Sequence, residues 1–450
     1  MAQQFDLVVI GTGVAGAPVA TACREAGWEV ALVDDHPYGG TCALRGCDPK
    51  KVLVGAADAV DWARRMAGRG IEPGGVRIDW PALIRFKDSF TGPRPAARRA
   101  GFEQAGIACF DGHARFVGPT VLRVGDEELE GRHVVIATGA KPQPLGIAGE
   151  EHLTISDDFF DLAALPERVV FIGGGYISLE FAGVAATAGA QVTVLHRSGH
   201  LLRGFDEDLA DQLTAYLRSQ DLDIQLDTAV SGIAEQDGGL AVAATTPAGP
   251  RTFEADLVVH GAGRVPNVDD MGLEAANVAF DRRGVRVNEH LQSVSNPAVY
   301  AAGDAAGSPG PPLTPAGGVD ADVVSANLLE GNRVTPNYGV MPTAAFTNPP
   351  LAAVGLGEAE ARAQGLRFST NYADAARWAT ATRLAQPCYG YKVLIEEETD
   401  RILGAHLLGP HADEVINVFA VAMQAGMTAT ALKEMLLAYP TTSSDLYYML

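Results

Sequence analysis

The strongest constraint on the fold is a pattern that occurs twice, in which a short apolar run leads into clustered glycines, a helical stretch and a second apolar run. The first copy starts with Leu7–Ile10 and ends with Glu29–Val33, which Asp34 follows. This order is typical of a βαβ unit that binds a dinucleotide, because the glycines let a pyrophosphate approach a helix start and the acid accepts hydrogen bonds from a ribose. The residues predicted to form this first site are Gly11, Gly13, Gly16 and Asp34.

The second copy starts with Val169–Ile172, and its second apolar run is Gln191–Leu195. Gly173 and Gly175 lie in the turn between the first run and the helical stretch. A single glycine cluster is weak evidence, but here the strand, turn and helix follow in the expected order. The chain is therefore predicted to contain two dinucleotide sites.

Two arginines distinguish the second site. Arg197 lies just after the strand, where an acid would hold a free ribose 2′-hydroxyl, and Arg203 follows one short loop later. Guanidinium groups without a carboxylate favour a 2′-phosphate, so the pattern indicates NADPH. The alternative is that both arginines are solvated surface charges.

Two close cysteines, Cys42 and Cys47, follow the first copy. On a regular helix, residues five apart lie roughly 8.7 Å apart, beyond the reach of a disulfide of about 7 Å. We therefore predict that the pair straddles a helix start, with Gly46 in a distorted turn and Pro49 in the first helical turn. Free N–H groups at such a start stabilise a thiolate at Cys47, which indicates redox chemistry. The alternative is two buried or unpaired core cysteines.

Composition excludes several classes of protein. The chain has 450 residues, of which 47% are hydrophobic and 20% charged, as is ordinary for a globular protein of several domains. The net charge of −21 argues against nucleic acid and anionic membrane surfaces as partners. The five widely spread cysteines do not resemble a secreted disulfide scaffold, and neither a signal segment nor a membrane span is evident. We therefore expect a cytoplasmic protein.

Further strand-and-turn segments lie between and after the two copies, at Val134–Gly139, Val258–Gly263 and Val299–Asp304. A Pro- and Gly-rich stretch at 306–318 then precedes a helical run over Val319–Leu329, which indicates a boundary or a ligand-facing loop. After about residue 337 the pattern changes to alternating strands, including Lys392–Ile395 and Ile402–Leu408, followed by helices. This last part is predicted to be a separate α+β domain.

Two dinucleotide patterns, a Cys-x4-Cys run at the end of the first and a late Gly303-Asp304 together resemble the flavin-dependent pyridine nucleotide–disulfide oxidoreductases. That family includes glutathione reductase, dihydrolipoamide dehydrogenase and mercuric reductase. The resemblance covers essentially the whole chain and implies an α/β fold with two Rossmann-like dinucleotide-binding domains and a C-terminal α+β dimerisation domain. It implies FAD in the first site, NADPH in the second and a homodimer.

On this basis we expect three domains, which are formed by four segments of the chain. An FAD-binding domain would consist of residues 1–145 and 266–335, with the redox disulfide in its first part. An NADPH-binding domain would cover residues 146–265, and the dimerisation domain would cover residues 336–450.

The resemblance also implies roles for individual residues. Cys47 would contact the flavin, Cys42 would meet the electron acceptor, and Lys50 would lie near the flavin N5 edge, paired with Glu180. Asp304 would hold the flavin ribityl chain. The remaining residues expected at FAD are Gly40, Thr41, Lys51, Thr138, Gly139 and Thr314.

In the NADPH-binding domain, the resemblance implies a site formed by Gly173, Gly175, Arg197, Arg203 and Gly263. Tyr176 would cover the nicotinamide pocket. Its alternative role is that of a packed aromatic residue.

The chain departs from the family near its C-terminus. The family commonly has His-Pro-Thr followed shortly by Glu, so that the His shuttles the proton a leaving thiol needs, whereas this chain has Tyr439–Thr441 and then Asp445. A tyrosine with an ordinary pKa near 10 is a poor base at neutral pH, and positioned proton transfer is worth roughly 10²–10⁴ in rate. Tyr439 is expected to act as a donor or ligand. Asp445 is expected either to compensate for the missing acid or to cap a helix at the surface.

A second departure is Asp48, where the family usually has an apolar residue. Its carboxylate suits a helix N-terminus, and it also makes the neighbouring Cys47 thiolate harder to form. An acceptor that needs no protonated leaving thiol, such as a soft metal ion on the Cys42 thiolate, is least affected by these losses. We therefore expect electrons to pass from NADPH through FAD and the Cys42–Cys47 disulfide to a thiol-binding metal ion, as in mercuric reductase, or to an atypical disulfide.

Several alternatives remain open from the sequence. One is a glutathione-type low-molecular-weight disulfide reductase, and another is a quinone reductase. The additional C-terminal cysteine pair of mercuric reductase has no counterpart, because Cys388 is the last cysteine of the chain. An alternative of another class is a redox-sensing flavoprotein that binds a partner with little turnover.

Overall fold

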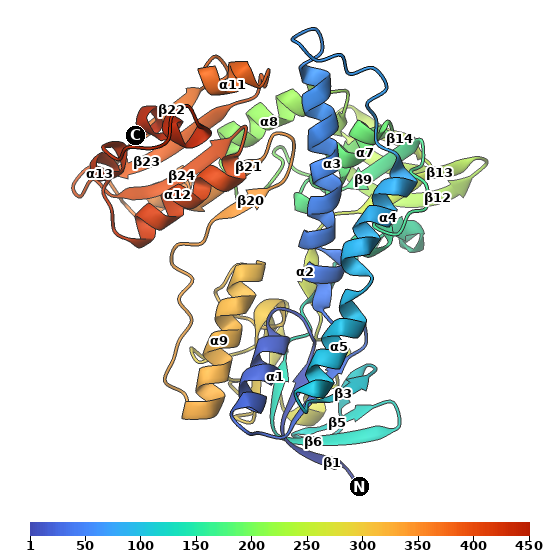
Figure 1. The fold of residues 1–450 in the computed structure, drawn as a ribbon. Helices are drawn as coiled ribbons and strands as arrows, with labels where there is room; N and C mark the ends of the chain where they lie inside the picture. Colours follow the sequence, from blue (N-terminus) through green and yellow to red (C-terminus); the bar gives the residue numbers. More distant parts are fainter. The chain divides into compact units, whose positions relative to one another are not determined.

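The computed structural model describes all residues from Met1 to Leu450. The chain forms two compact units, each assembled from three segments of the sequence (Figure 1). The first unit contains residues 1–49, 86–143 and 264–338, and the second contains residues 50–85, 144–263 and 339–450. Helices α3 (Cys47–Arg65) and α4 (Trp80–Thr91) each have residues in both units.

The first unit is built on a seven-stranded sheet. Five of its strands run parallel in the order β3, β2, β1, β6 and β19, and the antiparallel strands β5 and β4 extend it from the first half of β6. The strands are β1 (Gln3–Ile10), β2 (Val30–Asp34), β3 (Ala108–Asp111), β4 (Ala114–Phe116), β5 (Val121–Val124), β6 (Glu127–Ile136) and β19 (Val299–Ala301). A two-stranded sheet, β7 (Ala140–Pro142) with β16 (Arg264–Pro266), and the hairpin β17 (Phe280–Asp281) with β18 (Gly284–Val285) complete the strands.

Alternate residues of β1 enter two different hydrophobic cores, as the period of a strand requires. Leu7 and Val9 pack in a core with residues of α1 (Gly16–Glu25) and α9 (Thr314–Glu330). Val8 and Ile10 pack in a second core on the other face of the sheet. The parallel strands are therefore apolar on both faces, and their carboxyl ends lie at one edge. The helices α2 (Gly40–Arg45) and α5 (Arg94–Gln104) complete this unit.

The second unit contains a five-stranded parallel sheet in the order β11, β10, β9, β15, β8. Its strands are β8 (Leu153–Thr154), β9 (Arg168–Ile172), β10 (Gln191–Leu195), β11 (Asp223–Gln225) and β15 (Leu257–His260). The helices that pack around one core with this sheet include α6 (Ser156–Phe159), α7 (Tyr176–Ala188), α8 (Glu207–Ser219) and parts of α3 and α4. A separate antiparallel sheet consists of β12 (Ala229–Gln236), β13 (Gly239–Thr246) and β14 (Gly249–Ala255).

The same unit contains a C-terminal antiparallel sheet in the order β20, β21, β24, β23, β22. Its strands are β20 (Thr343–Ala345), β21 (Leu351–Gly355), β22 (Phe368–Asp374), β23 (Gly390–Glu396) and β24 (Ile402–Leu408). Its helices are α10 (Glu358–Ala363), α11 (Ala379–Arg383), α12 (Ala412–Gln424), α13 (Ala429–Lys433) and α14 (Leu446–Met449). The amphipathic α12 packs Val415, Ile416 and Phe419 into the core of this sheet.

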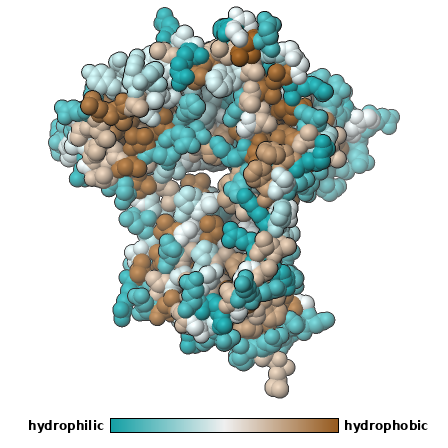
Figure 2. Space-filling view, viewed as in Figure 1, coloured by the Kyte–Doolittle hydropathy of each residue, from teal (hydrophilic) through white to brown (hydrophobic).

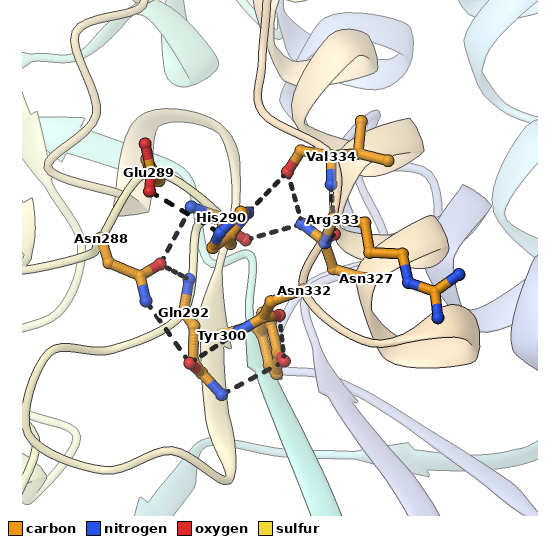
Figure 3. A network of polar contacts seen from close by, with 9 residues as sticks. All are labelled: Asn288, Glu289, His290, Gln292, Tyr300, Asn327, Asn332, Arg333 and Val334. Carbon is orange, nitrogen blue, oxygen red and sulfur yellow. Dashed lines mark hydrogen bonds and ion pairs between the residues drawn. The ribbon is translucent and has the colours of Figure 1, made fainter.

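A network of polar contacts holds the segment that follows α9 in the first unit (Figure 3). The fully buried Asn327 accepts hydrogen bonds from the backbone N–H groups of Arg333 and Val334, both at 2.9 Å. Its amide donates to the carbonyls of His290 and Val334, at 3.1 and 2.9 Å. Asn332 extends the network, because it accepts a hydrogen bond of 2.8 Å from the Tyr300 hydroxyl. The segment at 331–334 is thereby fixed in place.

None of the helices combines the length and apolar character that a bilayer crossing requires. In Figure 2, polar and apolar residues are intermingled on the face that is shown. One hollow of about 450 Å³ lies on α12 and is lined by Val340, Asn417, Ala420, Val421, Gln424 and Ala425. Val421 is 70% exposed there, which leaves an apolar side chain of α12 uncovered in the single chain.

Candidate active site

The glycines of the two sequence patterns lie in the turns that precede α1 and α7. Gly11 has φ +107° and Gly173 has φ +110°, a region that side chains rarely adopt. A Cβ at Gly11 would lie 2.2 Å from the carbonyl oxygen of Ala137, so only glycine fits. Gly13 follows in the first turn, and Gly16 is the first residue of α1. Both turns therefore bring bare backbone to a helix start, which fits a pyrophosphate.

Asp34 is the last residue of β2 and lies beside the first of these turns. Its Oδ2 accepts hydrogen bonds from the backbone N–H of Thr12, at 2.8 Å, and from the Thr12 hydroxyl, at 2.5 Å. The carboxylate is thus fixed at the carboxyl edge of the parallel sheet, where folds of this kind bind their ligands. Thr12 positions Asp34, although the sequence pattern did not single it out.

The other residues expected at FAD in this unit follow β6 and β19. The Thr138 hydroxyl donates to the carbonyl of Asn267 at 2.7 Å, and the Asn267 N–H donates to the carbonyl of Gly139 at 2.9 Å. Asp304 is partly buried, which raises the pKa of its carboxyl, and the charge of Arg264 opposes this shift. A half-buried acceptor at the carboxyl edge fits the hydroxyl groups of FAD.

Gly40 and Thr41 are the first residues of α2 in the first unit. Lys51, also expected at FAD, belongs to the second unit and to α3. Its Nζ lies 3.3 Å from Asp413 Oδ2 and 3.9 Å from the ring centroid of Phe346.

The two cysteines lie on either side of a break between helices, as the sequence predicts. Cys42 is in α2, which ends at Arg45, and Cys47 is the first residue of α3. Gly46 makes the break, and a Cβ there would lie 2.8 Å from the carbonyl oxygen of Thr41. The side chains of Cys42 and Cys47 are thiols that share a hydrogen bond.

Thr314, the first residue of α9, contacts both sulfurs. Its hydroxyl donates to Cys42 Sγ at 3.2 Å and lies 3.7 Å from Cys47 Sγ. The hydrogen bond with Cys47, followed by burial, raises the pKa of the Cys42 thiol, whereas the Thr314 hydroxyl lowers it. The net effect of these contacts is a raised pKa, so the Cys42 thiolate is harder to form.

Asp48, beside Cys47, forms an ion pair of 2.5 Å with Arg94 Nη1. The same nitrogen donates to the carbonyl oxygen of Ala43 at 2.8 Å. Asp48 stands out in the sequence because it adjoins Cys47, whereas no motif surrounds Arg94.

Lys50 and Glu180 form the expected ion pair, in which Nζ and Oε2 are 2.5 Å apart. The Glu180 side chain is fully buried and also accepts a hydrogen bond of 2.8 Å from the backbone N–H of Phe346. A buried carboxylate needs such partners. In turn, Glu180 holds the Nζ of Lys50, whose side chain is only 16% exposed.

Tyr176 is the first residue of α7, next to Gly175. Its hydroxyl lies 3.0 Å from Thr343 Oγ1, and its ring meets Phe205 edge to face at 5.7 Å. Burial raises the pKa of the Tyr176 hydroxyl. Gly263, at φ +120°, follows β15 of the same sheet.

Arg197 and Arg203 follow β10 and are both exposed. No carboxylate lies within ion-pair distance of either, so their charges are available to a phosphate. Next to them, His196 has a buried Nδ1 without a hydrogen-bond partner, and a Cβ at Gly174 would lie 2.8 Å from its ring. Two exposed guanidinium groups beside a glycine turn fit a phosphorylated dinucleotide.

The two C-terminal residues at which the chain departs from the family, Tyr439 and Asp445, have different surroundings. Tyr439 is 81% exposed in the single chain. Asp445 is buried and accepts a hydrogen bond of 2.8 Å from the Tyr389 hydroxyl. The expectation that Asp445 caps a helix at the surface is wrong. Its carboxylate is buried, makes no capping hydrogen bond to α14 and accepts the hydrogen bond of Tyr389 in the core. Burial raises the pKa of the Asp445 carboxyl.

Comparison with known families gives matches over nearly the whole chain. Residues 5–321 match the family described as pyridine nucleotide-disulphide oxidoreductase. Residues 341–449 match the dimerisation domain of the same family, which supports a homodimer.

Individual relatives agree with the family match. The chain is 33% identical over 449 residues to a glutathione reductase of Burkholderia cepacia, covering 98% of this chain and 97% of that enzyme. It is 28% identical to a mercuric reductase of Lysinibacillus sphaericus, covering 99% of this chain and 82% of that enzyme.

Among solved structures, a Cu(II) complex of the HOCl-induced flavoprotein disulfide reductase RclA from Escherichia coli has a TM-score of 0.88 at 28% identity. The alignment covers 99% of both chains. The chain therefore belongs to the pyridine nucleotide–disulphide oxidoreductase family and is a flavoprotein oxidoreductase that uses FAD and NAD(P)H.

Proposed function

We propose that this enzyme takes electrons from NADPH and passes them through the Cys42–Cys47 pair to an external acceptor, either a thiol-binding metal ion or an atypical disulfide. The observation that supports this proposal most directly is the meeting of both sulfurs at Thr314 Oγ1, across the break between α2 and α3. Two thiols so close can form and break one disulfide.

When bound, NADPH supplies a hydride and FAD carries its two electrons toward the protein disulfide. Gly11, Gly13 and Asp34 would hold FAD, together with Asp304. Gly173, Gly175 and the two arginines Arg197 and Arg203 would hold NADPH. The Lys50–Glu180 ion pair would place the lysine side chain in the role that the family resemblance gives it at the flavin.

The protons of the dithiol restrict the choice of acceptor. Reduction of a disulfide requires the Cys42 thiolate to attack one sulfur while the other leaves as a thiol, and Cys47 then closes the protein disulfide. The hydrogen bond with Cys47 raises the pKa of the Cys42 thiol, so a base would assist this attack. The family's histidine is replaced by Tyr439, and the carboxylate of Asp445 is engaged by Tyr389.

A metal ion has no leaving thiol that must be protonated. In that reaction the two thiols give up two electrons and two protons and become a disulfide. One Hg²⁺ takes up both electrons, whereas Cu²⁺ takes one, so two Cu²⁺ ions are reduced for each disulfide formed. The names of two relatives favour this acceptor class: one is a mercuric reductase, and the other was solved as a Cu(II) complex.

A second candidate acceptor is a low-molecular-weight disulfide. It is favoured by the 33% identity to a glutathione reductase, which extends over nearly the whole of both chains. Proton transfer in this case would need water or Tyr439 in place of the histidine.

The decisive experiment measures NADPH oxidation by the FAD-loaded enzyme with Hg²⁺, Cu²⁺, glutathione disulfide, other small disulfides and quinones. We expect turnover with the metal ions that Cys42→Ser abolishes, whereas the half-buried Cys109→Ser control retains it. Turnover with quinones that survives the loss of both thiols would contradict the route through the cysteines. An enzyme that turns over slowly with every acceptor would support a redox-sensing role instead.

The preference for NADPH has its own test. Because Arg197 and Arg203 have no carboxylate partner, we expect Arg197→Glu to lower kcat/KM for NADPH about tenfold or more and to change that for NADH much less. Steady-state kinetics with both coenzymes measures the ratio. Equal losses of kcat/KM with the two coenzymes would show that Arg197 does not bind the 2′-phosphate.

A further inference from the structure

Arg94, the first residue of α5, links the two residues that directly follow the redox cysteines. Its Nη1 donates to the carbonyl oxygen of Ala43, next to Cys42, at 2.8 Å. The same nitrogen lies 2.5 Å from Oδ2 of Asp48, next to Cys47. One guanidinium group therefore holds both sides of the break between α2 and α3.

The break needs such support because regular helix hydrogen bonds do not continue through it. Helix α2 ends at Arg45 and α3 begins at Cys47. Gly46 lets the backbone fold back closely, but it does not hold the two halves together. Thr314 contacts the pair at the sulfurs, and Arg94 contacts it at the flanking residues.

The contact also has an electrostatic component. The negative charge of Asp48 is one of the causes that raise the pKa of the Cys42 thiol. Arg94 places a positive charge directly on this carboxylate. The side chains of Arg94 and Asp48 are 34% and 49% exposed, and an ion pair this exposed contributes little to the stability of the whole fold. Its effect is therefore expected at the cysteines themselves.

We propose that Arg94 is a positioning residue of the redox pair, whose hydrogen bonds to Ala43 and Asp48 keep the two thiols within bonding range and so set the dithiol–disulfide equilibrium. This inference rests on the proposed function of the pair. If the turn is held closed, each thiol has a high effective concentration toward the other and the disulfide is favoured. If the turn opens, the dithiol is favoured.

The test equilibrates the FAD-loaded enzyme with mixtures of oxidised and reduced dithiothreitol and measures the fraction of Cys42–Cys47 disulfide by alkylation and mass spectrometry. In this exchange two electrons and two protons pass from the protein dithiol to the oxidised reagent. We expect Arg94→Met to shift the equilibrium about tenfold toward the dithiol, which corresponds to about 30 mV for a two-electron couple.

Three further variants separate the effects of the Arg94 charge, of its fork geometry and of its contact with Asp48. Arg94→Lys keeps the charge but not the fork geometry, so we expect a smaller shift. Asp48→Asn keeps the hydrogen bond from Arg94 to Ala43. We therefore expect its shift of the dithiol–disulfide equilibrium to be smaller than that of either Arg94 variant. The matched control is Arg98→Met, one turn further along α5, where the exposed arginine forms no hydrogen bond or ion pair. Circular dichroism confirms that each variant folds.

The outcomes distinguish the inference from the function on which it rests. A wild-type enzyme that forms no Cys42–Cys47 disulfide in any mixture would refute the proposed function. A disulfide whose equilibrium is the same in Arg94→Met, Arg94→Lys and wild type would refute only the positioning role. An equal shift in Arg98→Met would show that general helix charge, and not the contact at the turn, is responsible.

Discussion

Cys42 and Cys47 have identical side chains but different surroundings. Cys42 is partly buried in α2, and Cys47 is exposed at the first position of α3. The hydrogen bond with Cys47 is the main cause that raises the pKa of the Cys42 thiol. The single hydroxyl of Thr314 works in the opposite direction. Cys47 and Thr314 thus have opposite effects on the pKa of Cys42, and burial adds to that of Cys47.

This arrangement predicts opposite effects of two substitutions on the alkylation of Cys42 in the reduced enzyme. Cys47→Ser removes the main cause of the raised pKa, so the thiolate fraction and the rate with iodoacetamide at about pH 8 should rise severalfold to tenfold. Thr314→Val removes the hydroxyl that lowers the pKa, so the rate should fall. Mass spectrometry of the Cys42 peptide measures both rates. Changes of the same sign in the two variants would contradict this account.

At the site, the sequence indicates residues whose spacing is local and misses those brought together by the fold. The break at Gly46 follows from the spacing of the cysteines, and the Lys50–Glu180 pair follows from the resemblance. Arg94 is 46 residues from Asp48, and Tyr389 is 56 residues from Asp445. Neither partner has a motif, so only the packing of distant elements reveals that these carboxylates are engaged.

At the scale of elements, apolar periodicity predicts the strands well. Strands β10 and β24 have the bounds expected from sequence, Gln191–Leu195 and Ile402–Leu408, because charged or turn residues delimit both runs. By contrast, β6 starts at Glu127, well before the expected run from Val134. Its first half pairs with the antiparallel β5, and residues Glu127, Gly131 and Arg132 do not carry a strand pattern. Cross-strand pairing, and not local propensity, makes this half a strand.

Lys392 in β23 connects the C-terminal sheet with α8 of the same unit. The lysine is only 4% exposed, and its Nζ lies 2.7 Å from the buried carboxylate of Asp206 and 2.5 Å from the exposed carboxylate of Asp208. Asp206 also accepts a hydrogen bond from the Leu209 N–H at the start of α8. The lysine therefore joins two elements that are far apart in the sequence.

We expect Lys392→Met to destabilise the protein by about 3–5 kcal/mol, because it leaves the carboxylate of Asp206 buried without a counter-charge. Asp208→Asn is the matched control: this carboxylate is 57% exposed, and its loss should cost no more than about 1 kcal/mol. Thermal and urea unfolding compare the two variants. Similar midpoints for both would show that the buried charge pair does not stabilise the contact between α8 and β23.

At the scale of the whole molecule, the two family matches together cover nearly the whole chain. The match over residues 5–321 includes both glycine turns and the cysteine pair, and the dimerisation domain covers residues 341–449. An exposed Tyr439 and the uncovered Val421 on α12 are consistent with an assembly in which the single chain is not the final form. On the proposed function, the redox capacity of each chain is that of its flavin and its dithiol.

This capacity predicts the outcome of an anaerobic titration with dithionite. If Cys42 and Cys47 form the redox pair, each chain takes up two electrons in the disulfide and two more in FAD, and a long-wavelength band from a thiolate beside the flavin appears midway. Cys42→Ser should halve the uptake, whereas Cys388→Ser, at a thiol that is 2% exposed and distant in sequence from the pair, should leave it unchanged. An uptake of two electrons in all three proteins would mean that the sulfurs take no part in the reaction, and the acceptor would then have to meet the flavin directly.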